Sequence, residues 1–76
     1  MLDKRLRECR ENKKVTQREV AGFLGITVPA YQRYELGLRE PNISALNKLA
    51  DYFDVSVDYL LGRKNDEPLH PADPAL

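Results

Sequence analysis

The chain carries apolar residues at helical spacing in five separate stretches, with turn-forming residues between them. The first stretch runs from Leu2 to about Lys13, where Leu2, Leu6 and Cys9 recur on one face between charged residues. Spacings of three and four residues are typical of an amphipathic helix. We expect Cys9 to be a small core side chain, because no His or second Cys lies nearby to support the alternative of a reactive thiol.

Residues 16–34 predict two short helices joined by a tight turn. Thr16 and Glu19 form a capping box, in which the hydroxyl and the carboxylate each accept a hydrogen bond from a backbone amide at the helix start. Gly25 stands where a left-handed residue would end the first helix, and Thr27 can cap the second. The pair predicts a helix-turn-helix, whose second helix can enter the major groove of DNA. A helical hairpin without DNA would show the same caps.

The second helix of this pair has one face for packing and one face for a partner. Tyr31 and Tyr34 fall on the packing face, three residues apart. The other face consists largely of Val28, Pro29, Gln32 and Arg33. A proline in the first turn loses no hydrogen bond, but it disfavours the helical conformation of the residue before it. The helix start would therefore shift by one residue if Thr27 is the cap.

Two further helices are predicted beyond a loop that ends at Pro41. Asn42 can cap the first of them, and Ser56 can cap the second, which Gly62 would close. The expected core positions of the longer helix are Ile43, Leu46, Leu49, Ala50 and Phe53. Those of the short final helix are Val57, Leu60 and Leu61.

The remaining residues contain three prolines and little periodicity. This composition predicts a flexible tail, so we divide the chain into a folded domain over residues 1–62 and a tail over residues 63–76. The prolines recur at three-residue steps. That spacing would also suit a polyproline segment that binds a partner, which stays an alternative.

Length and composition make several classes of protein unexpected. A domain of 76 residues buries roughly 60% of the surface that its unfolded chain exposes, enough for a core but not for a deep catalytic cleft as well, so we do not expect an enzyme. A single cysteine cannot form an internal disulfide, and no apolar run suits a membrane span or a signal peptide, so we expect a cytoplasmic protein. The one histidine, His70, lies among prolines, and no catalytic or metal-spaced cluster occurs. Neither a metal nor another cofactor is therefore expected.

The charges balance overall but are unevenly distributed. Twelve basic and twelve acidic side chains cancel, which is not typical of a nucleic-acid binder. Residues 1–40, however, carry nine Lys or Arg against six Asp or Glu, a net charge of plus three, whereas residues 41–76 carry three against six, a net charge of minus three. A basic front and an acidic back would orient the domain toward a polyanion. A solvated surface of mixed charge is the alternative.

Several motifs stand in an order and spacing that are jointly specific. They are R-L-R-E-C-R at 5–10, T-Q-R-E-V-A at 16–21, G-I-T at 25–27, Y-E-L-G-L-R-E-P at 34–41 and V-S-V-D-Y-L-L-G at 55–62. Over about residues 5–62 the chain resembles the phage repressor and Cro-like helix-turn-helix family. The resemblance implies an all-α, compact five-helix domain of the lambda-repressor type. It also implies binding to double-stranded operator DNA, usually as a symmetric dimer, to regulate transcription.

The resemblance implies roles for individual residues. The groove-facing positions, in a recognition helix that starts near Thr27, align with Thr27, Val28, Pro29, Gln32 and Arg33. We expect Gln32 and Arg33 to discriminate bases, because Gln can pair with adenine N6 and N7 and Arg with guanine O6 and N7. The two apolar residues would contact thymine methyl groups instead. For Arg33, a phosphate contact or a free surface charge is the alternative.

Other residues of the family pattern bind the DNA backbone or brace the recognition helix. The expected phosphate-binding residues are Thr16, Gln17, Arg10, Arg39 and Asn42. At a helix start, unpaired amides and the positive end of the helix dipole both favour an anion. Arg10 and Glu35 match a family ion pair that joins the first helix to the end of the recognition helix. Lys14 stands where relatives often carry Gly, so we expect that turn to be strained or differently built.

These implications support one leading hypothesis and one alternative. The leading hypothesis is a dimeric repressor-like factor whose two recognition helices, about 34 Å apart, read a near-palindromic operator. The alternative is an antitoxin-like or adaptor protein that binds a partner protein through its acidic C-terminal half or tail and regulates its own gene through DNA. The expected dimer-interface residues are Val57, Tyr59 and Leu61, with Phe23 and Tyr52 as either a second interface or core padding.

Overall fold

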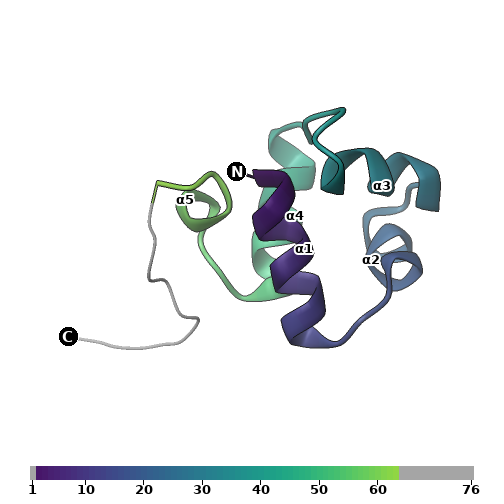
Figure 1. Cartoon of the computed structure of the whole chain (residues 1–76), viewed down its shortest axis with the longest axis horizontal. Coiled ribbons are helices and arrows are strands. Elements are labelled where there is room, and N and C mark those ends of the chain that lie inside the picture. The colour runs from purple at the N-terminus through teal and green to yellow at the C-terminus, as the bar shows by residue number, and fades with distance from the viewer. Residues whose placement is uncertain (1, 64–76) are drawn as a thin grey trace.

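The computed structural model of the chain describes residues 2–63, and these residues form five α-helices (Figure 1). In chain order the helices are α1 (Leu2–Lys13), α2 (Gln17–Leu24), α3 (Val28–Glu35), α4 (Ile43–Phe53) and α5 (Val57–Leu60). No strand occurs in this part of the chain, so the prediction of an all-α, five-helix fold is confirmed. None of these helices is both long and apolar enough to cross a membrane. The predicted tail lies, apart from Arg63, outside the described residues.

The helices are arranged so that the helix-turn-helix forms one end of the domain. Figure 1 shows α2 and α3 at one end, α1 and α4 in the middle, and α5 at the opposite end. The third helix packs against α1 and α2, whereas α5 packs against α1 and α4. The helix α3 is thus supported from the interior by two helices.

Each helix contributes one large, fully buried side chain to the core. These side chains are Leu6, Val20, Tyr31, Leu49 and Leu60, each with an exposed fraction of 0%. Burying a side chain of this kind stabilises a fold by roughly 1.5–3 kcal/mol. Cys9 lies in the same core, and burial raises the pKa of its thiol to about 11. The burial of Cys9 confirms the prediction of a core cysteine. The raised pKa argues against the alternative of a reactive thiol, because a protonated thiol is a poor nucleophile.

Four helices begin at a polar side chain that accepts a hydrogen bond from the amide three residues later. The acceptors are Thr16, Thr27, Asn42 and Ser56, at 3.1, 3.2, 2.8 and 2.9 Å respectively. The capping box is complete, because the Thr16 amide donates to Glu19 Oε1 at 2.8 Å. The expected one-residue shift at the start of α3 does not occur. Val28 is the first helical residue and Pro29 the second, so Val28 adopts the helical conformation although the following proline disfavours it.

All five described helices end in the same two-bond turn around a left-handed residue. At the end of α3, the Gly37 amide donates to the Tyr34 carbonyl at 3.3 Å and the Leu38 amide to the Arg33 carbonyl at 2.9 Å. This pair of bonds is the Schellman motif. The left-handed residues of the five turns are Lys14, Gly25, Gly37, Asp54 and Gly62. The Lys14 turn is therefore built like the others, and its strain comes from a φ of 61° on a residue with a side chain.

The expected core of the last two helices is partly wrong. Ile43 is 77% exposed, because it is the first residue of α4 and precedes the turns that contact the other helices. Leu49, Ala50 and Phe53 are buried as expected. In α5 only Leu60 is fully buried, and the flanking positions 57 and 61 are half-buried on the rim of the core.

Candidate nucleic-acid interface

The start of α2 presents unpaired amides beside a basic side chain. Thr16 caps the third amide of the helix, which leaves the amides of Gln17 and Arg18 without a partner inside the helix. Unpaired amides and the helix dipole make such an end attractive to a phosphate. Arg18 adds a full positive charge at this end and is exposed.

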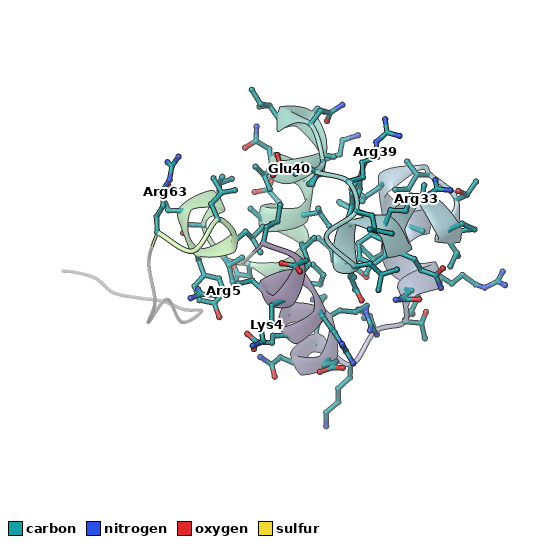
Figure 2. All side chains as sticks on the ribbon, turned by 45° about the horizontal axis from the view of Figure 1, so that its top comes forward. Lys4, Arg5, Arg33, Arg39, Glu40 and Arg63 are labelled. Atoms are coloured by element: carbon teal, nitrogen blue, oxygen red, sulfur yellow. The ribbon has the colours of Figure 1, made fainter. Side chains whose placement is uncertain are left out.

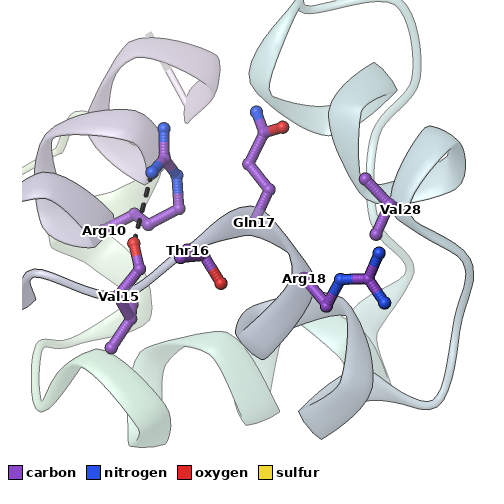
Figure 3. A pocket seen from close by; sticks show the side chains of 6 residues that line it. All are labelled: Arg10, Val15, Thr16, Gln17, Arg18 and Val28. Atoms are coloured by element: carbon purple, nitrogen blue, oxygen red, sulfur yellow. Dashed lines mark hydrogen bonds between the residues drawn. The ribbon is translucent and has the colours of Figure 1, made fainter.

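A hollow of about 580 Å³ lies in front of this helix start. Figure 3 shows the six residues that line it, and these are Arg10, Val15, Thr16, Gln17, Arg18 and Val28. The hollow therefore runs from the start of α2 to the first residue of α3. Thr16 and Gln17, which we predicted as phosphate-binding residues, border the same space as Val28, which we predicted as a base-reading residue.

The outer face of α3 is largely exposed. Thr27, Pro29, Gln32 and Arg33 are exposed, and Val28 is half-buried at the edge of the hollow. Figure 2 shows Arg33 on the same side of the molecule as Arg39, far from Arg63, which follows α5. Opposite this face, Tyr31 is fully buried and Tyr34 half-buried, so the predicted division of the helix into two faces is confirmed.

An ion pair joins α1 to the end of α3. Arg10 Nε donates to Glu35 Oε2 at 2.7 Å and Nη2 donates to Oε1 at 3.3 Å, while Nη1 donates to the Val15 carbonyl at 3.2 Å. The Glu35 side chain is only 4% exposed and that of Arg10 17%. The pair expected from the resemblance is present. It engages Arg10 on three nitrogens, which favours a positioning role for this residue over a direct phosphate contact.

The surroundings of Glu35 keep its carboxylate ionised. Burial by itself would raise the pKa of Glu35, but the hydrogen bonds from Arg10, with smaller contributions from the nearby Tyr31 hydroxyl and from Gln17, outweigh burial and lower the pKa below its ordinary value. Burial, together with the neighbouring Glu35 carboxylate, raises the pKa of Tyr31. Although the Tyr31 hydroxyl lies close to that charge, it has no partner within hydrogen-bonding geometry among the described residues.

Two glutamine side chains link this ion pair to the exposed face of α3. Gln17 Nε2 donates to Glu35 Oε1 at 3.1 Å, and Gln32 Nε2 donates to Gln17 Oε1 at 3.0 Å. We had assigned Gln17 to a phosphate and Gln32 to a base, as separate contacts. Their hydrogen bond joins residues 15 positions apart in the sequence, so no local pattern could indicate it.

The loop between α3 and α4 forms a second exposed region on the α3 side. Arg39 is exposed, and the Asn42 side-chain oxygen accepts from the Ala45 amide at 2.8 Å. Gly37 lies against the first turn of α1, where an added Cβ would meet Asp3 Oδ2 at 3.0 Å, and its φ is +75°. Glycine therefore fixes the path of this loop. Large apolar side chains flank it and are strongly exposed at Leu36, Leu38 and Ile43.

The proposed dimer residues lie in two separate places. Val57, Tyr59 and Leu61 are half-buried in and beside α5, where the Arg5 guanidinium lies 4.2 Å from the centre of the Tyr59 ring. Phe23 is 48% exposed and its ring centre lies 4.7 Å from that of Tyr52. Neither group is completely buried within one protomer.

One candidate residue was missed by sequence reasoning. Arg18 borders the hollow in front of α2, although no role was assigned to it from the sequence. A signal was present, because a basic residue at the second position of a capped helix lies next to unpaired amides. The proximity of Arg18 to Val28 at the start of α3 depends on the angle between α2 and α3, which the sequence does not show.

Comparison with known proteins agrees with this geometry. A helix-turn-helix family model matches residues 6–60. The chain is similar to the HTH-type transcriptional regulator YqaE of Bacillus subtilis (strain 168), with 48% identity over 67 residues, or 88% of this chain and 58% of YqaE. It is also similar to the HTH-type transcriptional regulator AnsR of the same organism, with 42% identity over 67 residues, 88% of this chain and 58% of AnsR.

A phage protein is among the more distant relatives. The cryptic phage CTXphi transcriptional repressor RstR of Vibrio cholerae is 36% identical over 62 residues, 82% of this chain and 55% of RstR. The chain thus spans less than two thirds of the length of these relatives. No solved structure matches it. Because the family model matches residues 6–60, which include part or all of each of the five helices, and the relatives align over most of the chain, this protein belongs to the helix-turn-helix family.

Proposed function

We propose that this chain is a sequence-specific DNA-binding transcriptional regulator, and specifically a repressor, that places α3 in the major groove. The observation that carries the proposal is the exposed face of α3 with Gln32 and Arg33, which is braced from behind by the Arg10–Glu35 ion pair and bordered by the unpaired amides of α2. An α-helix fits the width of the major groove of B-DNA. Regulators and a repressor among the relatives support the same function.

Base reading is assigned to the exposed residues of α3. Arg33 would donate to guanine O6 and N7, and Gln32 would pair with adenine. Val28 and Pro29 offer apolar surface for thymine methyl groups, and Thr27 adds a hydroxyl next to them. The half-buried position of Val28 at the rim of the hollow suits this role, because it holds the side chain in one place.

Phosphate binding is assigned to two regions on either side of α3. The first is the start of α2, with Thr16, Gln17 and the newly identified Arg18. The second is the loop before α4, with Arg39 and the α4 amides next to the Asn42 cap. Contacts of this kind fix the register of the protein on DNA and carry no sequence information directly. Arg10 would support the first region by holding α1 against α3.

We further propose that two copies bind a near-palindromic operator, with their recognition helices about 34 Å apart, one turn of DNA. The segment around Val57, Tyr59 and Leu61 is the first candidate for the contact between copies, because its apolar side chains are only half-buried in one protomer. The second candidate is the exposed pair formed by Phe23 and Tyr52.

Selection of bound sequences from random duplex DNA would test the function. We expect one sequence with two inverted halves to be enriched, and its affinity to fall steeply with salt, with a slope of about −0.9 per phosphate contact on logarithmic axes. The Arg33→Ala variant should select a relaxed sequence at one position of each half. A wild-type protein that enriches no sequence and binds DNA with no salt dependence would contradict the proposal.

A further inference from the structure

Three side chains form a hydrogen-bonded chain from the buried end of α3 to its exposed face. Glu35 is buried, Gln17 is half-buried and Gln32 is exposed. Gln17 Nε2 donates to Glu35 Oε1 at 3.1 Å, and Gln32 Nε2 donates to Gln17 Oε1 at 3.0 Å. The series of hydrogen bonds from Glu35 therefore ends at Gln32, to which we assign a base contact.

Each bond in this chain has a direction that hydrogen-bond chemistry fixes. An ionised carboxylate can only accept, so the atom of Gln17 that faces Glu35 must be the nitrogen. The oxygen of Gln17 then faces Gln32 and must receive a donor, so Gln32 also offers its nitrogen. Reversal of either amide would bring two acceptors or two donors together, at a cost that a partly buried site increases. An amide alone in solution would have no such preference.

We propose that Glu35, acting through Gln17, fixes the orientation of the Gln32 amide and thereby makes Gln17 a specificity-determining residue. This inference rests on the proposed function. In the fixed orientation, Gln32 presents its oxygen and one remaining N–H to the DNA. Adenine offers the complementary pair, an N6–H donor and the N7 acceptor, whereas guanine offers two acceptors, O6 and N7. Two donors from Gln32 would be needed for guanine, and Gln17 already holds one of them. Gln32 therefore favours adenine over guanine.

The test compares Gln17→Leu with Arg18→Ala. Both changes lie at the start of α2 and both remove a polar group next to the proposed phosphate, but only Gln17→Leu breaks the chain to Gln32. The operator base pair that Gln32 reads is located first, as the base pair at which the Gln32→Ala variant no longer prefers one base. Wild-type protein and both variants are then titrated against operators with adenine or guanine at that position.

We expect Gln17→Leu to reduce the preference for adenine over guanine by about tenfold, within the range of one good bidentate contact. Arg18→Ala should weaken both operators by the same factor. In a Gln32→Ala background, Gln17→Leu should have no effect on the preference. Thermal unfolding of each variant verifies that the fold persists, and the Gln32 side-chain amide signals in ¹⁵N NMR spectra of the free protein should shift in Gln17→Leu and not in Arg18→Ala.

Three results would overturn the inference. Equal weakening of both operators by Gln17→Leu would show that this residue contacts phosphate only. Gln32→Ala could leave the base preference unchanged at every operator position, or change it at a position where guanine is preferred. Either result would show that the Gln32 side-chain amide does not read adenine. If the wild-type protein selects no sequence at all, the proposed function fails and the inference fails with it. If the wild-type protein selects a sequence normally but Gln17→Leu keeps the same preference for adenine over guanine, only the inference is overturned.

Discussion

Glu35 connects the stability of the domain to pH. Because the folded protein lowers the pKa of Glu35 below its ordinary value of 4.5, the folded state holds this proton less tightly than the unfolded state does. The stabilisation is therefore fully present above pH 4.5 and is lost as the pH falls through the lowered value of the folded protein. We expect the free energy of unfolding, measured with urea, to decrease in this acid range. Glu35→Gln should flatten that part of the profile, and an unchanged profile would contradict the assignment.

The ion pair should be costly to break from one side. Arg10→Ala leaves the buried Glu35 carboxylate without its main partner, and we expect a loss of about 3 kcal/mol in the free energy of unfolding. The double variant Arg10→Met with Glu35→Leu removes both charges and keeps the volume, so it should recover most of this loss. Urea unfolding measures both. A double variant as unstable as the single one would show that the pair itself, and not the unpaired charge, determines the effect.

Lys14 carries backbone strain that a glycine would relieve. Its φ of 61° is costly for a residue with a Cβ, by about 1 kcal/mol. The added freedom of glycine in the unfolded chain offsets about half of this gain, so Lys14→Gly should raise the melting temperature by about 2 °C. Lys14→Ala removes the same charge and keeps the Cβ, so it serves as the control. If both variants melt alike, charge and not backbone strain would be responsible.

At the scale of the helices, the sequence predicted starts and ends well because the relevant contacts are local. The caps at Thr16, Thr27, Asn42 and Ser56 each bond an amide three residues away. The left-handed glycines that end three of the helices are equally local signals. Such signals act over a few residues, so a single sequence contains them in full.

Contacts between helices were predicted less well, for a physical reason. Ile43 fits the apolar spacing of α4, but spacing alone does not show that the first turn extends past the core. The Gln17–Gln32 bond depends on the angle between α2 and α3 and on the buried position of Glu35. Both quantities arise only when the whole domain packs, so these residues gave no signal in the sequence.

The start of α2 is predicted to make a measurable electrostatic contribution to DNA binding. Arg18→Ala removes one cation beside the unpaired amides, and the slope of affinity against salt on logarithmic axes should become shallower by about 1. Titrations of labelled operator at several salt concentrations provide the slope. Arg63→Ala offers a comparison, because this exposed arginine lies far from Arg33 and Arg39 (Figure 2), and its removal should change the slope less. Equal changes in both variants would mean that only the net charge matters.

At the scale of the whole molecule, the assembly of two copies can be tested with half-sites. If α5 carries the contact between copies, Leu61→Ser should weaken binding to a full operator by at least tenfold and leave binding to an isolated half-site nearly unchanged, because only the full site uses the interface. Phe23→Ser tests the second candidate surface in the same way. Sedimentation at several protein concentrations would show which variant dissociates. A full-site affinity unaffected by either change would exclude both surfaces.

The separation of core and outer face in α3 has an evolutionary consequence. Tyr31 anchors the helix in the core, while Pro29 and Arg33 are exposed and can be exchanged with little loss of stability. A lineage could therefore retarget such a domain to a new promoter by altering a few codons. Gln32 is the exception, since its partner on the neighbouring helix would have to change with it.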